Sequence, residues 1–417
     1  MNTETTFERE LRDLGFLFAT GIECSYPTIA GAGGTTQRVD LLKTTFHYRR
    51  WRDDLRLVHE LGLRYLRYGP PYYAMHLGSD RYDWSFADEV FAEMRRLDLV
   101  PIADLCHFGV PNWIGDFQNP DWPRLFAAYA GAFANRYPWI RFYTPVNEIF
   151  VCAKLSALNG VWNERQRSER AFVTALKHLC RANLLATEAI LSARADAIVI
   201  QSESAEYFHP ACHHEPGRRQ ADFENQRRFL PFDLLYAHPV RDDIREYLRA
   251  QGLTDEEYAW FMGQDLSARS VMGNDYYERN EQLVLHEGGI QPAGEVFGWL
   301  EITRQYYERY RRPVMHTETN NIERGAGFGP RWLWKEFLNV FHLREQGVPV
   351  IGFTWYSLQD QVDWDIALAS VRGLVNPVGL YDLDRRPRPA AGAYRQLLQE
   401  FAGLPAYPNP DWRAAGP

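Results

Sequence analysis

Short apolar runs alternate with longer amphipathic segments along almost the whole chain, and this alternation constrains the fold more than any other feature. Eight of the runs have the length and the β-branched or aromatic content of buried strands. They fall at residues 16–22, 63–68, 100–106, the first part of 142–150, 197–201, 270–277, 313–317 and 350–355. Because each run is followed by a helical pattern or a long loop, the sequence predicts an α/β fold, a parallel (β/α)8 TIM barrel.

The segments between the runs predict helices at 51–62, 85–97, 123–137, 168–195, 299–311, 332–346 and 390–401. Gly62 is a C-terminal stop signal, and Ser85 is expected as an N-cap. Residues 208–267 are the least regular part, which we expect to be an elaborated loop of the barrel. Since such barrels reach about 400 residues as one unit, we predict a single domain over 1–417, with its core at about 16–402.

Charge and composition exclude several classes of partner. The formal net charge is −8 and no basic block occurs, which argues against nucleic acid and anionic membranes. The sequence has no apolar run long enough to span a membrane and no secretory signal at its polar, acidic start. The five cysteines are scattered without a CxxC pair, which is typical of reduced thiols in a cytoplasmic protein. No cofactor is implied, and no feature specifies an oligomeric state.

Two of the predicted strands end in a glutamate. Asn147-Glu148 ends the run that starts at Phe142, and Glu318 follows the run 313–317. The C-terminal ends of barrel strands meet at the mouth where such enzymes place their catalytic groups. Cleavage of a glycosidic bond needs a carboxylic acid to protonate the leaving oxygen and a carboxylate to attack the sugar or activate water. A single glutamate at a strand end is more often a solvated or ion-paired residue. The hypothesis of a glycosidase site therefore rests on the two glutamates together.

Five motifs, in order and each at a predicted strand end, resemble those of the family 1 glycoside hydrolases, which are retaining β-glycosidases. The resemblance covers about residues 16–395. The motifs are His107 within LCHFGVPNW, the pair Asn147-Glu148, the triplet Asp275-Tyr276-Tyr277, the pair Thr317-Glu318, and GFTWYSLQDQVDW at 352–364. Each motif alone is a weak match to the family pattern, but the five together and in the same order are a specific signal.

The resemblance implies that Glu148 is the general acid/base and Glu318 the nucleophile. The apolar neighbours of Glu148 fit this role, because burial keeps a carboxylic acid protonated near neutral pH. In a retaining enzyme the two carboxyls lie about 5 Å apart, against roughly 6.5 to 9.5 Å in an inverting one. The resemblance also implies supporting or sugar-binding roles for Arg67, His107, Asn147, Asp275, Tyr277, Trp355, Tyr356, Asp363 and Trp364.

Departures from the family pattern fall on recognition of the far side of the sugar. Ser25-Tyr26-Pro27 stands where the family has Ser-Tyr-Gln, and proline has no donor to replace the amide. Asp363 is one methylene shorter than the family's glutamate, and Tyr356 stands in place of a tryptophan. We therefore expect the family's chemistry on an altered glycone. The phosphate-binding Ser-x-Lys-x-Tyr has no counterpart after Trp364, so a 6-phosphosugar is not expected.

The sequence thus predicts a cytoplasmic, metal-independent retaining β-glycosidase that removes a terminal sugar from a small glycoside. Two alternatives stay open: a transglycosylase with the same covalent intermediate, and a carbohydrate-binding barrel without catalysis. His209, His213 and His214 suggest a metal site, but no carboxylate stands at a matching spacing, so we expect none.

Overall fold

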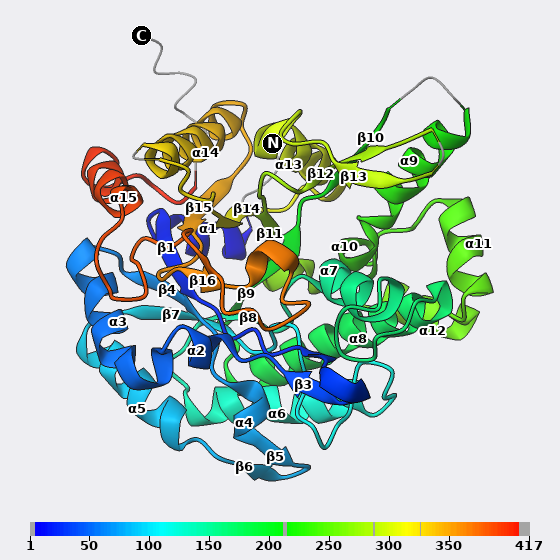
Figure 1. Cartoon of the computed structure of the whole chain (residues 1–417), viewed down its shortest axis with the longest axis horizontal. Coiled ribbons are helices and arrows are strands. Elements are labelled where there is room, and N and C mark those ends of the chain that lie inside the picture. Colours follow the sequence, from blue (N-terminus) through cyan, green and yellow to red (C-terminus); the bar gives the residue numbers. More distant parts are fainter. Residues whose placement is uncertain (1–4, 212–214, 287, 326, 408–417) are drawn as a thin grey trace.

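The structure is a closed barrel of eight parallel strands surrounded by helices (Figure 1). This computed structural model describes residues 5–211, 215–286, 288–325 and 327–407. The strands are hydrogen-bonded around the barrel in the order β1-β15-β14-β11-β9-β8-β7-β4. Their bounds are β1 Leu17–Ile22, β4 Tyr65–Tyr68, β7 Val100–Asp104, β8 Phe142–Thr144, β9 Ile198–Ser204, β11 Ser270–Asp275, β14 Val314–Thr319 and β15 Val350–Trp355. The predicted TIM barrel is confirmed, with each strand at its predicted place.

Helices between the strands cover the outside of the barrel. They are α3 His47–Leu61, α5 Ser85–Arg96, α6 Trp122–Arg136, α8 Glu169–Ala193, α13 Gly298–Tyr310, α14 Phe328–Glu345 and α15 Pro389–Glu400. Gly62 follows α3 with φ 92°, the left-handed conformation that ends helices. Ser85 is the first residue of α5 and not its N-cap, which is Trp84, and the Ser85 N–H donates to the Asp83 carboxylate at 3.0 Å.

The segment expected to be irregular, 208–267, is mostly helical and lies on one side of the barrel (Figure 1). It holds β10 Tyr207–Pro210, α9 Glu215–Arg227, α10 Leu230–Leu235, α11 Asp242–Ala250 and α12 Asp255–Met262. Helix-like patterns near 242–251 and 254–263 in the sequence indicate α11 and α12, whereas no pattern indicates α9 and α10. Arg227 of α9 is buried through ion pairs with Glu224 and Glu169, so a segment that reads as solvated packs against the barrel.

Shorter elements decorate the loops. They are α1 Thr6–Arg12, β2 Thr28–Ala30, β3 Thr36–Arg38, α2 Leu41–Thr44, α4 Tyr72–Met75, β5 His76–Gly78, β6 Arg81–Tyr82, α7 Ile149–Ala153, β12 Glu281–Val284, β13 Ile290–Pro292, β16 Gln361–Val362 and β17 Val375–Asn376. In the ranges that the structure describes, every helix is too short or too polar to cross a membrane.

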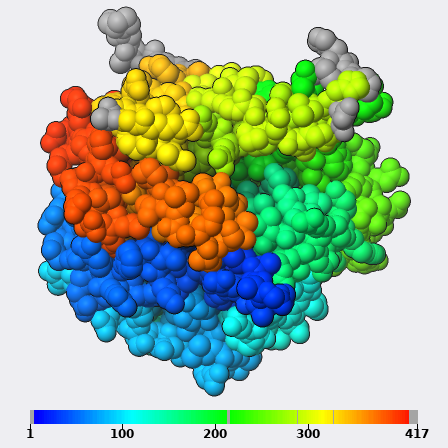
Figure 2. Space-filling model, viewed as in Figure 1, coloured from blue at the N-terminus to red at the C-terminus, as the bar shows by residue number. Residues whose placement is uncertain are grey.

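The N-terminal end of the barrel is closed and apolar. Phe7 and Leu11 of α1 pack with side chains near the starts of the strands, among them Leu17 and Phe142. This leaves the C-terminal ends of the strands as the accessible end of the barrel, where glycosidase-type barrels carry their sites. Figure 2 shows segments from distant parts of the chain meeting on one face, with the orange segment after β15 beside residues near the N-terminus.

Candidate active site

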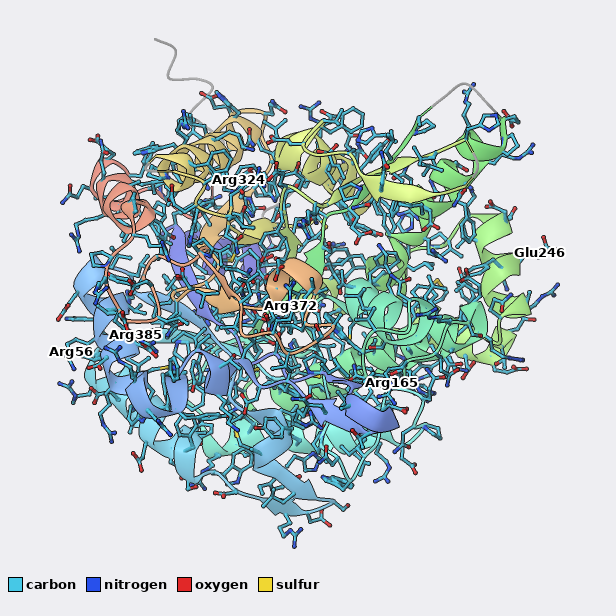
Figure 3. All side chains as sticks on the ribbon, viewed as in Figure 1. Arg56, Arg165, Glu246, Arg324, Arg372 and Arg385 are labelled. Atoms are coloured by element: carbon cyan, nitrogen blue, oxygen red, sulfur yellow. The ribbon has the colours of Figure 1, made fainter. Side chains whose placement is uncertain are left out.

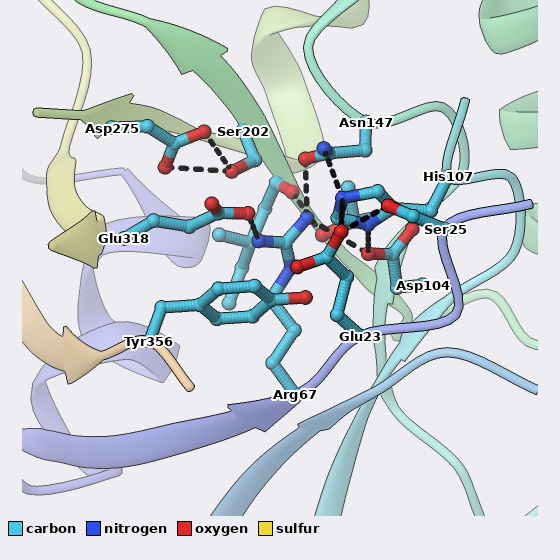
Figure 4. Close-up of polar contacts among 12 residues, drawn as sticks. Glu23, Ser25, Arg67, Asp104, His107, Asn147, Ser202, Asp275, Glu318 and Tyr356 are labelled. Carbon is cyan, nitrogen blue, oxygen red and sulfur yellow. Dashed lines mark hydrogen bonds and ion pairs between the residues drawn. The ribbon is translucent and has the colours of Figure 1, made fainter. Parts of the chain in front are cut away.

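One cavity of about 540 Å³ is lined by both predicted glutamates, Glu148 and Glu318. Glu148 follows β8, and Glu318 lies within β14. The structure brings His107, Tyr277 and Trp364 to the same cavity. Four further predicted residues are buried around it, and they are Arg67, Asn147, Asp275 and Tyr356 (Figure 4). The strand ends thus assemble groups that are far apart in the sequence.

Glu318 is held by two donors, one from β4 and one from the residues that directly follow β11. Arg67 of β4 donates from Nη1 to Oε1 of Glu318, and Tyr277 Oη donates to Oε2 at 2.6 Å. The Glu318 side chain is only 3% exposed. Both oxygens of Glu318 therefore accept a hydrogen bond, and one of the donors carries a positive charge.

Arg67 links Glu318 to the other side of the cavity floor. Its Nη2 lies 2.9 Å from Asp104 Oδ2 and also donates to Asn147 Oδ1. Burial lowers the pKa of Arg67, but Asp104 and Glu318 outweigh burial and hold that pKa above its ordinary value. Figure 4 shows the guanidinium between Glu318 on one side and Asn147 on the other. One planar cation therefore positions three site residues.

His107 and Asn147 have fixed orientations. Because Asn147 Oδ1 accepts from Arg67, its Nδ2 group faces His107 Nε2, at 3.0 Å. His107 accepts this bond, so its proton sits on Nδ1, which lies 2.7 Å from Asp104 Oδ2. His107 thus lines the cavity in a defined orientation, held from behind by Asn147.

Glu148 sits at a strained point of the chain, directly before α7. Its φ of 38° is in the left-handed region, which is uncommon for residues other than glycine. Its N–H donates to Ser202 O at 2.9 Å. The buried carboxylate of Glu203 accepts the next two N–H groups, from Ile149 at 3.1 Å and Phe150 at 3.2 Å. Glu203 thereby fixes the turn that aims Glu148.

Sequence reasoning missed Glu203, which lies two residues beyond the predicted strand 197–201. The only sequence signal for Glu203 is that an acidic residue stands close to the end of a predicted strand. Burial raises the pKa of Glu203 to about 8, although the N–H donors of Phe150 and Ile149 lower it.

The electrostatic surroundings of Glu148 differ from those of Glu318. Burial raises the pKa of Glu148 well above its ordinary value, and the nearby carboxyls of Asp275 and Glu318 raise it further. Asp275 lies at the end of β11, where both of its oxygens are within 2.8 Å of Ser202 Oγ. Burial and Glu318 also raise the pKa of Asp275. These surroundings suit a protonated Glu148.

Two aromatic residues expected at the site are placed behind it. Trp355 is core: it is 1% exposed, and its indole N–H donates to Val378 O at 3.0 Å. Tyr356 is equally buried, with its ring parallel to that of His107 at 6.2 Å. Neither of them lines the cavity.

Asp363, expected to bind sugar hydroxyls, does not line the cavity. Its carboxylate accepts three backbone N–H groups, from Arg372, Gly373 and Leu374, each at 2.9 Å. Asp363 therefore anchors the loop that precedes β17. Its neighbour Trp364 does line the cavity, as predicted from the position of its motif.

Glu23 was not predicted as a site residue. It lies just before Ser25-Tyr26-Pro27, the segment where the family has its sugar-binding glutamine. It follows the last residue of β1 and lines the cavity, whereas Tyr26 and Pro27 do not. Ser25 Oγ and Trp364 Nε1 donate to Oε1 of Glu23, and Gln361 Nε2 donates to Oε2. The signal was available, because the residue directly after a barrel strand points to the mouth.

The rim of the cavity is charged. Arg324 donates to Glu278 Oε2 at 3.1 Å, and Arg279 donates to Asp365 O at 3.0 Å. Arg372 also pairs with Asp365. Figure 3 shows Arg324 and Arg372 near the middle of the face, away from peripheral residues such as Glu246.

No group of three or more His, Cys, Asp or Glu side chains is arranged to hold a metal ion within the described residues. His209 instead pairs with Glu281 at 2.6 Å. Glu281 also accepts the N–H of Phe297 at 2.9 Å, which gives this pair a structural role. His213 and His214 lie outside the described residues.

A parallel eight-stranded barrel with two glutamates lining a cavity at the strand ends has the architecture of a glycosidase. Comparison with known proteins gives the same class. Residues 43–242 match the sequence model of glycosyl hydrolase family 1. The chain is a glycosidase that resembles glycosyl hydrolase family 1 in sequence over nearly half of its length.

Characterised relatives align along most of the chain. β-Glucosidase A of Thermotoga maritima is 22% identical, and the alignment covers 79% of this chain and 81% of the relative. The 6-phospho-β-glucosidase AscB of Escherichia coli is also 22% identical, over 77% of this chain and 76% of the relative. A solved structure of the Thermotoga maritima β-glucosidase with glucoimidazole superimposes with a TM-score of 0.77 at 18% identity, covering 93% of this chain and 98% of that one.

Proposed function

We propose that the protein is a retaining β-glycosidase in which Glu318 is the nucleophile and Glu148 the general acid/base. The observation that carries this assignment is the contrast between the two carboxyl groups in one cavity. Glu318 has a guanidinium and a phenol as donors. Glu148 is buried beside carboxyls that raise its pKa. Paired carboxyls in contrasting surroundings are how such enzymes divide acid from nucleophile.

In the first step Glu318 attacks the anomeric carbon while the bond to the leaving oxygen breaks. Glu148 gives its proton to that oxygen, so the aglycone departs as a neutral alcohol, and the sugar is joined to Glu318 as an ester. In the second step the Glu148 carboxylate takes a proton from water, and the resulting oxygen attacks the anomeric carbon and releases Glu318. Two inversions give net retention.

The surrounding residues hold the sugar and the carboxylates. We propose that Asn147 binds the hydroxyl next to the anomeric carbon, that His107 contacts a further hydroxyl, and that Trp364 packs against the sugar face. Arg67 and Tyr277 keep Glu318 ionised and oriented. Asp275 and Tyr356 support these groups from behind, in contact with Ser202 and His107 respectively.

The proposed substrate is a small β-glycoside from which one terminal sugar is removed, acted on by a single-domain protein without a cofactor. The relatives named for β-glucosidase activity support the β-glycoside class. A cytoplasmic location is part of the proposal, since Cys24, Cys106, Cys152 and Cys180 are buried free thiols, as expected in a reducing compartment.

The test is a panel of aryl α- and β-glycosides with gluco, galacto, fuco, xylo, manno, glucurono and rhamno sugars. Wild type and Glu318→Ala are compared side by side. We expect turnover of at least one β-glycoside, lost in the variant, and proton NMR of the first product formed should show the β-anomer. The α-anomer as first product would overturn retention. Glycoside products formed with added alcohol in place of hydrolysis would identify a transglycosylase, and sugar binding without turnover a binding protein.

A further inference from the structure

The lining of the cavity contains a buried carboxyl group, that of Glu23, without a lysine or arginine partner. Glu23 is 7% exposed, and the three groups that donate to it, from Ser25, Gln361 and Trp364, are all neutral. In the described ranges no lysine or arginine forms an ion pair with Glu23. A buried anion without a cation is costly, and burial indeed raises the pKa of Glu23 to about 7.

The two nearby basic groups are committed elsewhere. Arg67 pairs with Asp104 and Glu318. His107 Nε2 lies 3.7 Å from Glu23 Oε1, but that nitrogen accepts from Asn147, and the ring proton is on Nδ1 facing Asp104. Burial lowers the pKa of His107, but Asp104, Glu23 and Glu318 hold it above its ordinary value, so His107 offsets part of the charge of Glu23 from 3.7 Å without a direct hydrogen bond. A ligand cation that hydrogen-bonds to Glu23 would complete this neutralisation.

Position along the wall indicates where on the sugar that cation belongs. Asn147 precedes Glu148 in the chain, His107 is hydrogen-bonded to Asn147, and Glu23 lies 3.7 Å from His107 (Figure 4). For a sugar whose anomeric carbon faces Glu148 and Glu318, we expect the second carbon on the Asn147 side and the third and fourth carbons toward His107 and Glu23.

We propose that Glu23 selects an amino sugar, a glycone that carries an ammonium group on its third or fourth carbon. This inference rests on the proposed glycosidase function and names its substrate class. The ammonium donates to the free acceptor capacity of Glu23 and neutralises the buried charge. A glycone with a carboxylate or phosphate at this end of the ring is repelled by the same carboxylate.

The experiment uses aryl β-glucosides that differ by one group: the parent, the 3-amino-3-deoxy and 4-amino-4-deoxy sugars, and the 2-amino-2-deoxy sugar as a positional control. For wild type we expect kcat/KM to favour the 3-amino or the 4-amino sugar over the parent by about tenfold or more. In Glu23→Gln that ratio should fall to one or below, since the amide keeps the shape and loses the charge. The 2-amino control should respond much less to this change.

Two controls separate loss of selectivity from loss of fold. Ser25→Ala removes one neutral donor and keeps the carboxylate, so it should retain the amino preference, and thermal unfolding checks both variants. An unchanged amino-to-hydroxyl ratio in Glu23→Gln, or a wild type that prefers the parent sugar, would overturn the proposal.

Calorimetry with the 4-amino and 3-amino sugars as non-hydrolysable thioglycosides measures binding apart from turnover. Binding that Glu23→Gln weakens by about tenfold, in a protein that cleaves no glycoside, would support the inference and sink the proposed function. Turnover of glycosides without any preference for the amino sugars would support the proposed function and overturn the inference about Glu23.

Discussion

The two sides of the cavity place the same residue type in opposite surroundings. On the β14 side, Glu318 receives hydrogen bonds from Arg67, which reaches it from β4, and from Tyr277, which follows β11. On the β8 and β9 side, no described residue donates to the Glu148 carboxyl group, and Asp275 stands nearby. A donor-rich site favours the carboxylate, whereas a buried, anion-rich site favours the acid.

The comparison shows that the division of roles is set by neighbours and not by the glutamates themselves. The donors to Glu318 come from β4 and from the residues that directly follow β11. The turn at Glu148 is held from β9, where Ser202 O accepts its N–H and Glu203 accepts the next two. If these neighbours set the roles of Glu148 and Glu318, a substitution of one glutamate or one of its neighbours should change the reaction in a predictable way.

The largest effect is expected for Glu148→Ala, and it should depend on the leaving group. Without the acid, an alkyl glycoside should lose roughly 10² to 10⁴ in kcat/KM. A dinitrophenyl glycoside needs no protonation and should retain most of its first-step rate. A plot of rate against leaving-group pKa measures this. The matched control is Glu206→Gln, a cavity glutamate paired with Lys154, which should show no such dependence. Equal losses on both substrates would contradict the assignment.

The next largest effect is expected for Arg67→Lys, which should lower kcat/KM by roughly 10². A lysine supplies one point charge and cannot contact Asp104, Asn147 and Glu318 together, as the planar guanidinium does. The thermal midpoint should fall as well, because a buried ion pair is broken in part. If the variant kept both its rate and its midpoint, the network would not be what organises the Glu318 side.

Tyr277→Phe removes a single hydrogen bond to Glu318 and should lower kcat by about 10 to 100-fold, as expected for a bond worth about 1.5 to 3 kcal/mol to a charged group. The adjacent tyrosine is the control. Tyr276 donates to Glu281 Oε1 at 2.7 Å, outside the cavity lining. Tyr276→Phe should therefore affect stability and leave kcat nearly unchanged. Similar kinetic losses in both would mean that the effect is structural.

The sequence predicted the parts of this site that depend on strand ends. Hydrophobic runs located all eight strands, and a parallel barrel brings their C-terminal ends to one mouth, so Glu148 and Glu318 were expected to meet. Both line one cavity in the structure.

The parts that depend on loop paths could not be predicted. Asp363 turns to the N–H groups of Arg372, Gly373 and Leu374, a contact that no local pattern specifies. Glu23 is a different case, because it directly follows β1 and so had a strand-end signal, but the family motif pointed to Ser25-Tyr26-Pro27, two residues further along. The helix α9 was missed because ion pairs bury its charged residues.

The smallest expected effect is a shift of the pH profile by Asp275→Asn. Glu148 acts as an acid, so activity falls as pH rises through its raised pKa. Asp275 is, after burial, the main cause that raises this pKa. Removing its charge should lower the pKa of Glu148 and move the alkaline limb of kcat/KM to lower pH, by about one unit or less. The amide can still accept from Ser202, so the fold should hold.

Asp365→Asn is the control for that shift, because it removes the same charge from the rim, where Asp365 pairs with Arg372 and water screens it. Its profile should match wild type. An alkaline limb that moves to higher pH in Asp275→Asn, or that moves equally in both variants, would mean that Asp275 does not keep Glu148 protonated. The limb reports a macroscopic pKa of the coupled carboxyls, so the comparison between the two variants carries the conclusion and not the absolute value.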